Sequence, residues 1–219
     1  MCARVSTISY AGHHGAPLCD QDYCYDEILL DGLREKLANL SRDTVIVMHM
    51  IGSHGPAYSS RYPPAYESFK PACRSSELER CTTGEIVNAY DNTLLYTDHV
   101  VASAIDELRA ASAGVDGVLL YVSDHGESLG EQGIYLHGLP YTFAPSAQTH
   151  VPMLVWMSSG YGAAHRIDSR CLQSEAARDV SHDNLYHTLL GAAGVRNASY
   201  DGTLDLIRSC AAPLARSHE

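Results

Sequence analysis

The sequence has no long apolar run. No stretch of its 219 residues approaches the roughly 18 consecutive apolar residues that cross a bilayer. Met1 is not followed by the basic region and apolar core of a signal peptide. We therefore expect neither a transmembrane segment nor an export signal in the chain as written.

Clustered basic residues are also absent. The chain holds 15 Lys and Arg against 26 Asp and Glu, which gives a formal charge of −11. Proteins that bind nucleic acids use clustered Lys and Arg to neutralise phosphates, and no such run appears here, so a nucleic-acid partner is excluded. If the substrate is itself anionic, a bound metal ion must supply the attraction.

The seven cysteines include no CxxC pair, which argues against a zinc site built from four thiolates. Two pairs lie at short spacings in segments rich in turn residues: Cys19 with Cys24, and Cys73 with Cys81. This pattern predicts local disulfides formed in an oxidising compartment, and free thiols in a cytosolic protein are the alternative. Cys2 has no partner at local spacing, and a bond between Cys171 and Cys210 is left open.

Periodic apolar residues predict the helices. The composition, with 45% hydrophobic and 19% charged residues, is that of a globular protein with one substantial core. Apolar residues recur at helical intervals from Asp26 to Leu40 and from about Glu85 to Ser112, which predicts two amphipathic helices. Ser181 is a good N-cap for a third helix, which we expect to end at Leu190 before Gly191.

Three short runs rich in β-branched and apolar residues predict buried strands. They are Thr44–Met50 (TVIVMHM), Val118–Val122 (VLLYV) and His150–Met157 (HVPMLVWM). Buried strands that alternate with helices indicate an α/β fold in which helices flank a mostly parallel sheet. No internal repeat or low-complexity segment divides the chain, so we expect one domain.

Histidine and carboxylate side chains follow the ends of the predicted strands. His54 comes after the first strand, Asp124 and His125 come directly after the second, and His137 lies in a short loop further on. The carboxyl ends of parallel strands meet at one edge of a sheet, so we expect these side chains to converge. Imidazole nitrogens together with a carboxylate oxygen suit Zn²⁺, and the flanking glycines let the backbone pass close to a metal.

Each of these residues also has a simpler interpretation. Asp124 alone could cap the turn that follows its strand. His54 or His137 alone could be solvated or bonded to a backbone carbonyl. The convergence of three Gly-flanked or Asp-linked histidines on one edge favours the metal site.

Four segments carry a specific resemblance. They are MIGSHGPAYSSRYP, VNAYDNTLLYTD, LLYVSDHGESLGEQGIYLHGLPYTFAPSAQTHVPMLVW and VSHDNLYHTLLG. In order and spacing they resemble the catalytic domain of the lipid A phosphoethanolamine transferases. That family lies in the alkaline phosphatase and sulfatase superfamily and includes the mobile colistin-resistance enzymes. The resemblance implies that residues 1–219 are the C-terminal part of a sulfatase-like catalytic domain.

The resemblance also implies roles for individual residues. Asp124 and His125 match the primary zinc ligands of the family, and His54 and His137 match histidines that hold a second zinc ion or the substrate phosphate. Glu127 matches an acidic residue that binds metal or moves protons, and a hydrogen bond that only supports a ligand is the alternative.

His49 also matches a family histidine. We interpret it as a substrate contact, with packing in the core as the alternative.

In the family that the sequence resembles, a zinc-activated threonine attacks phosphatidylethanolamine, and the phosphoethanolamine group then passes to a phosphate of lipid A. These enzymes work at the periplasmic face of the inner membrane. The resemblance therefore implies phosphatidylethanolamine as the donor and lipid A as the acceptor. It implies contact with the membrane only through a domain that lies outside this sequence.

The sequence departs from the family pattern at its start. The threonine nucleophile and one zinc-binding glutamate of the family fall in the part that would precede Met1. In the family, the cysteine that matches Cys2 pairs with another cysteine just upstream, and that partner would also precede Met1. We therefore expect this polypeptide alone to bind zinc incompletely and to be weak or inactive as a transferase. The alternatives are a sulfatase or phosphodiesterase-type hydrolase and a degenerate gene product without catalytic function.

Overall fold

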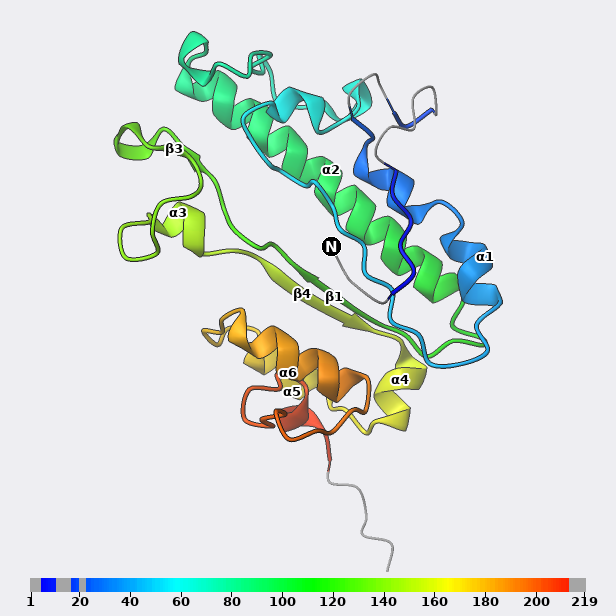
Figure 1. The fold of residues 1–219 in the computed structure, drawn as a ribbon. Coiled ribbons are helices and arrows are strands. Elements are labelled where there is room, and N and C mark those ends of the chain that lie inside the picture. Colours follow the sequence, from blue (N-terminus) through cyan, green and yellow to red (C-terminus); the bar gives the residue numbers. More distant parts are fainter. Residues whose placement is uncertain (1–4, 11–16, 20–22, 213–219) are drawn as a thin grey trace, which may run out of the picture. The chain divides into compact units, whose positions relative to one another are not determined.

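A computed structural model describes residues 5–10, 17–19 and 23–212 of the chain (Figure 1). The chain folds as two units. Unit 1 is drawn from Met1–Glu35, Val47–Asp106 and His125–Pro152, and unit 2 from Lys36–Ile46, Glu107–Asp124 and Met153–Glu219.

The long helix α2 (Thr83–Ala110) organises the core of unit 1, and it confirms the helix predicted from Glu85 to Ser112. Its start is a capping box: Thr82 Oγ1 accepts the Glu85 N–H at 3.3 Å, while Glu85 Oε2 accepts the Thr82 N–H at 2.7 Å. Its buried residues recur every three or four positions and include Ile86, Ala89, Tyr96 and Val100. These side chains pack in two apolar clusters, one around Tyr58 and one around Tyr62.

The helix predicted from Asp26 to Leu40 is divided in two. A 3-10 helix, η1, covers Asp26–Leu30, and a short helix, α1, covers Leu33–Ala38. Gly32 between them has a φ of +68°. That left-handed conformation ends one helical segment before the other begins, and glycine adopts it without a steric penalty.

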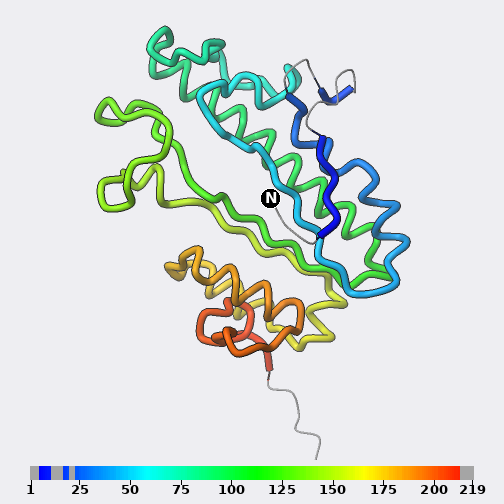
Figure 2. The backbone as a smooth tube through the Cα atoms, viewed as in Figure 1, coloured from blue at the N-terminus to red at the C-terminus, as the bar shows by residue number. Residues whose placement is uncertain are grey.

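The predicted strand Thr44–Met50 does not form among the described residues. Val45 is 70% exposed and Val47 is 80% exposed. A strand requires a hydrogen-bonded neighbour, and no pairing of the described residues includes this segment. Residues 47–52 instead pass beside α2 as extended chain (Figure 2), and Met50 packs against the cluster of Tyr62, Tyr96 and Val100.

Strand pairing in the described residues is antiparallel, whereas the sequence predicted a mostly parallel sheet. In unit 2, β1 (Val118–Val122) pairs with β4 (Met153–Met157), with Val122 opposite Met153. β1 confirms its prediction. β4 begins later than the predicted His150, because α3 (Ser146–Thr149) is capped at His150 and Pro152 has no N–H to donate to a strand.

A small hairpin lies in unit 1. Its strands are β2 (Ser128–Leu129) and β3 (Tyr135–Leu136), which pair antiparallel. The turn between them contains the 3-10 helix η5 (Glu131–Gly133). Three further 3-10 helices of unit 1 are η2 (Tyr58–Ser60), η3 (Pro64–Tyr66) and η4 (Leu78–Arg80).

Side chains cap two short helices of unit 2. Ser158 Oγ accepts the Tyr161 N–H at the start of α4 (Ser159–Ala164), and Asp168 caps α5 (Ser169–Glu175). The helix predicted from Ser181 forms as α6 (Asp183–Ala192), but its N-cap residue is His182, which makes no side-chain capping bond. The Ser181 hydroxyl lies one residue earlier in the chain and accepts the Asp183 N–H at 3.2 Å. A last 3-10 helix, η6, covers Arg208–Cys210.

Three disulfides are present in the described residues. The Cys19–Cys24 and Cys73–Cys81 bonds confirm the local pairs, and the bond left open, Cys171–Cys210, is formed. Cys2 lies outside the described residues.

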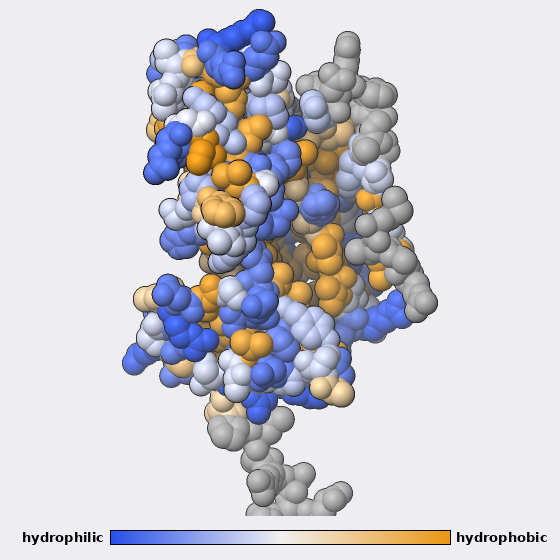
Figure 3. Space-filling view, turned by 60° about the vertical axis from the view of Figure 1, so that its left-hand side comes forward, coloured by the Kyte–Doolittle hydropathy of each residue, from blue (hydrophilic) through white to orange (hydrophobic). Residues whose placement is uncertain are grey.

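No helix in the described part of the chain combines the length and the apolar character needed to cross a membrane. Apolar residues nevertheless reach the surface between polar ones, as Figure 3 shows for one face. Tyr141 and Phe143, in the loop after β3, are 86% and 76% exposed.

Candidate metal centre

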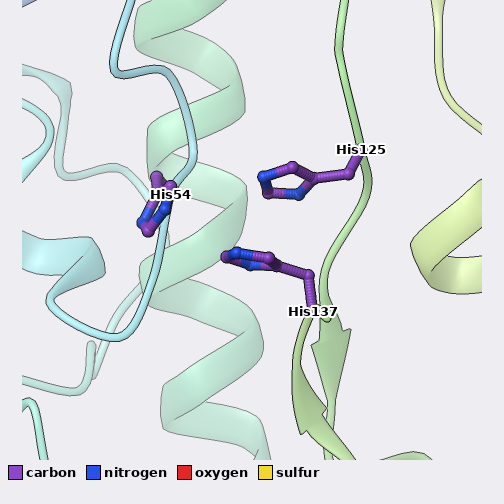
Figure 4. Close-up of side chains that lie close together, drawn as sticks. All are labelled: His54, His125 and His137. Atoms are coloured by element: carbon purple, nitrogen blue, oxygen red, sulfur yellow. The ribbon is translucent and has the colours of Figure 1, made fainter. Parts of the chain in front are cut away.

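Three histidines of unit 1 meet at one point. His54, His125 and His137 each offer a ring nitrogen, and these nitrogens all lie within 4.8 Å of one another. Figure 4 shows the rings of His125 and His137 directed toward His54. The rings of His125 and His137 stack with their centroids 3.8 Å apart, and the His54 ring meets the His137 ring edge-on at 4.9 Å. Three segments distant in sequence thus bring their imidazoles together, as the sequence predicts.

Hydrogen bonds fix the tautomers of these rings. His54 Nδ1 lies 2.7 Å from the Gly55 carbonyl oxygen, and His125 Nδ1 lies 3.0 Å from the Gly126 carbonyl oxygen. A carbonyl oxygen can only accept, so both Nδ1 atoms must carry the proton and donate it. In the neutral ring, Nε2 then carries the lone pair through which imidazole binds a metal.

Glu127 orients the third ring. Its carboxylate is buried, and Oε1 lies 3.1 Å from His137 Nδ1 and accepts the Gly55 N–H at 3.0 Å. Its second oxygen, Oε2, accepts from the Tyr58 hydroxyl at 3.4 Å. A carboxylate that holds the far nitrogen of a histidine is a common support for metal-binding imidazoles, since it fixes the ring and raises its basicity. These contacts are of the kind expected if Glu127 supports a ligand, and its part in metal binding or proton transfer stays a prediction.

Tyr58 is held as a neutral donor beside Glu127. Burial and, to a smaller extent, the charge of Glu127 raise the pKa of the Tyr58 phenol well above its usual range. The hydroxyl therefore stays protonated and can donate to the carboxylate.

Two glycines allow the loops to approach this closely. A Cβ at Gly126 would lie 2.0 Å from the Ala147 carbonyl oxygen, and a Cβ at Gly55 would lie 2.6 Å from Leu136 Cδ2 and 2.7 Å from the Tyr58 hydroxyl. Real Cβ atoms do not come so close to other atoms, so any larger residue would displace the segment that carries His125 or His54.

The donor set fits a zinc ion. Zinc binds imidazole nitrogen at about 2.0–2.1 Å, so two ligand nitrogens on one ion are at most about 4.2 Å apart. The three nitrogens lie within 4.8 Å of one another, which is close to the spacing that metal ligands require. Three neutral imidazoles also leave room for a further ligand in a tetrahedral site.

Two predicted site residues lie outside this cluster. Asp124 is exposed and belongs to unit 2, whereas His54, His125 and His137 all belong to unit 1. The role of Asp124 as a zinc ligand stays a prediction. His49 is also exposed, so its side chain is not packed in the core, and substrate contact stays a prediction for it.

Comparisons with known proteins agree with the sequence resemblance. The sequence model of the sulfatase family matches residues 1–195. Among curated proteins, the phosphoethanolamine transferase EptA of Escherichia coli strain K12 is 49% identical over 210 residues, which cover 95% of this chain and 38% of that protein. The chain thus spans well under half the length of this relative.

Solved structures show the same similarity. The soluble domain of lipooligosaccharide phosphoethanolamine transferase A from Neisseria meningitidis superposes with a TM-score of 0.85 at 41% identity, covering 90% of this chain and 60% of that one. The C-terminal periplasmic domain of EptC from Escherichia coli, solved in complex with zinc, gives a TM-score of 0.67 at 29% identity and covers 86% of this chain and 53% of that one. These matches confirm the predicted sulfatase-like α/β fold class.

Proposed function

Because the chain belongs to the sulfatase family, and its relatives are named phosphoethanolamine transferases, we propose that it is the zinc-binding part of such a transferase. The donor would be phosphatidylethanolamine, the acceptor a phosphate of lipid A, and the place of action the periplasmic face of the inner membrane. The observation that carries this proposal is the meeting of His54, His125 and His137, each with Nδ1 already engaged.

Each residue has a part in the proposed reaction. Asp124 and His125 would bind the primary zinc ion, and His54 and His137 a second zinc ion or the phosphate of the substrate. A bound zinc ion lowers the pKa of a hydroxyl nucleophile and neutralises charge on phosphoryl oxygens. Glu127 would keep His137 in the tautomer that presents Nε2, and His49 would contact the substrate from the exposed segment before His54.

Zinc binding is the first test of this proposal. We expect the purified chain to take up zinc, and the double variant Asp124→Ala, His125→Ala to lose most of it, measured by competition with a chelator of known affinity. The matched control is His165→Ala in unit 2, because His165 is exposed and stacks on Tyr161, away from the histidines of unit 1 in the sequence. Equal zinc uptake by the double variant and the unaltered chain would remove the metal assignment.

A second test separates transfer from hydrolysis, the reaction that other members of the sulfatase family would suggest. The zinc-loaded chain is incubated with phosphatidylethanolamine and lipid A, and in parallel with a soluble phosphodiester. Because the threonine of the family pattern falls outside this sequence, we expect at most a small mass increase of lipid A by one phosphoethanolamine group. An increase that His137→Ala removes supports the transferase. Turnover of the soluble ester with lipid A unchanged would favour the hydrolase.

A further inference from the structure

The loop that carries His54 is held at its beginning by a buried carboxylate. Asp26 is 6% exposed, and its two oxygens accept the backbone N–H groups of Ile51 and Gly52, each at 2.8 Å. Both bonds are charge-assisted when the carboxylate is ionised, which makes them stronger than bonds between neutral groups. The backbone just before His54 is therefore fixed to η1, which is 25 residues earlier in the sequence.

The same loop is held at its end by a buried guanidinium. Arg61 is 6% exposed, and its Nε donates to the His54 carbonyl oxygen at 2.9 Å. The guanidinium also lies over the Tyr23 ring, 4.6 Å from its centroid, which restricts its plane. His54 is thus bonded through its carbonyl to Arg61 and through its ring to the Gly55 carbonyl, so the direction of its Nε2 is set.

The two charged groups also affect each other. Burial raises the pKa of the Asp26 carboxyl, while the Ile51 and Gly52 N–H groups, and after them the charge of Arg61, act in the opposite direction. Arg61 therefore favours the charged form of Asp26, which is the form that can accept both N–H groups.

Arg61 also costs stability in the folded chain. Its Nη1 atom is buried and has no hydrogen-bond partner within the described residues. A buried donor without a partner costs free energy, and an apolar side chain of similar length would avoid that cost. Such a side chain would also lose the bond to the His54 carbonyl, the contact with the Tyr23 ring and the charge near Asp26. Of these, the bond to His54 bears directly on the metal ligand.

We propose that Asp26 and Arg61 are positioning residues that clamp the loop Ile51–Gly55 from its two ends and so present His54 Nε2 to a metal ion. This inference rests on the proposed zinc-binding function. Neither residue would touch the ion or the substrate. Removing a group that orients a metal ligand typically lowers metal affinity about 10–100-fold.

The test compares zinc affinities across a set of variants. In Asp26→Asn the amide nitrogen faces one of the two N–H donors, and in Arg61→Met the bond to the His54 carbonyl is lost. We expect each change to weaken zinc binding at least about tenfold, and Arg61→Lys, which keeps the charge, to be affected less than Arg61→Met. Both changes act through one loop, so the double variant should be only slightly weaker than either single variant.

A His54→Ala background separates positioning from a general loss of structure. In that background the ligand being positioned is absent, so Asp26→Asn and Arg61→Met should leave the residual zinc affinity unchanged. A further weakening of the same size would overturn the clamp. The matched control is Asp205→Asn in unit 2, which also alters a buried carboxylate bonded to two backbone N–H groups. We expect its zinc affinity to equal that of the unaltered chain.

The outcome also distinguishes the clamp from the function on which it rests. Unchanged zinc affinity in Arg61→Met and Asp26→Asn, with normal binding by the unaltered chain, would overturn the clamp alone. An unaltered chain that binds no zinc would overturn both proposals. Denaturant unfolding of each metal-free variant shows which of them are folded. If Asp26→Asn does not fold, the zinc affinity of Arg61→Met tests the clamp.

Discussion

Both units bury carboxylates, but the groups that these carboxylates hold are different. In unit 1, Asp26 holds the loop before His54, and Glu127 holds His137 Nδ1 and the Gly55 N–H. In unit 2, Asp205 accepts the N–H groups of Ile207 and Arg208 and the Tyr200 hydroxyl, which lies 2.6 Å away. The same chemistry thus orients candidate metal ligands in one unit and a turn of the chain in the other. Changes in unit 1 should therefore alter metal binding, and comparable changes in unit 2 should alter stability.

The strongest expected effect comes from removing a ligand of unit 1. Structural zinc sites bind with roughly 10–16 kcal/mol shared among four ligands, so His125→Ala should lose roughly 3 kcal/mol or more of zinc binding, over a hundredfold in affinity. Isothermal titration with zinc in a competing chelator measures this loss. If His125→Ala keeps its zinc affinity, the contrast between the two units has no basis.

Disulfide removal should act on stability, and more in unit 2 than in unit 1. The Cys171–Cys210 bond closes a sequence separation of 39 and the Cys73–Cys81 bond a separation of 8. Loop-closure entropy gives about 4 kcal/mol for the first and about 2.5 kcal/mol for the second. Replacing each pair with alanine and following denaturant unfolding tests the order of the two losses. Zinc affinity that falls with the Cys171–Cys210 bond would contradict a metal site confined to unit 1.

Buried carboxylates provide the matched pair. Glu127→Gln places an amide beside donors in unit 1, and we expect zinc affinity to fall about 10–100-fold. Asp205→Asn makes a similar change in unit 2, and there we expect a loss of about 2 kcal/mol in the free energy of unfolding with zinc affinity unchanged. Chelator competition measures the zinc affinity of both variants, and urea unfolding measures their free energy of unfolding. Similar zinc losses in both would show that Glu127 acts through general stability.

The smallest expected effect concerns alkaline pH. Burial raises the pKa of Tyr96 in unit 1, whereas the hydroxyl of Ser199 lowers the pKa of Tyr186 in unit 2. The unfolded value is about 10, so the stability that Tyr96 contributes is fully present below about pH 10 and is lost as pH rises toward its folded pKa. Tyr96→Phe should therefore flatten the fall in unfolding free energy above pH 10. The pKa of Tyr186 is shifted in the opposite direction, so Tyr186→Phe should not flatten the fall in unfolding free energy.

The sequence predicted which side chains lie together better than it predicted what holds them. Glycine-flanked histidines after apolar runs indicated that His54, His125 and His137 would meet, which the structure shows, and their roles stay predictions. The sequence gives no local signal for Asp26 or Arg61, since their partners are 25 and 7 residues away and become neighbours only in the folded chain.

The fold was predicted in part for similar reasons. The capping box and apolar period of α2 are local, so the helix was predicted close to its observed bounds. Strand pairing is not local: the composition of Thr44–Met50 is typical of a strand, yet the described residues give it no partner, and β1 and β4 pair antiparallel. Likewise, the apolar spacing across Asp26–Leu40 predicted one continuous helix. Gly32 lies within that range, and its positive φ divides the helix in two.

The proposed function depends most on zinc binding by the histidine cluster of His54, His125 and His137 through Nε2. X-ray absorption at the zinc edge of the zinc-loaded chain tests it directly. We expect a first shell that contains imidazole nitrogen at about 2.0–2.1 Å, with the outer-ring scattering of histidine reduced when any one of the three is changed to alanine. A first shell of oxygen or sulfur without histidine scattering, or a spectrum that the three alanine variants leave unchanged, would contradict it.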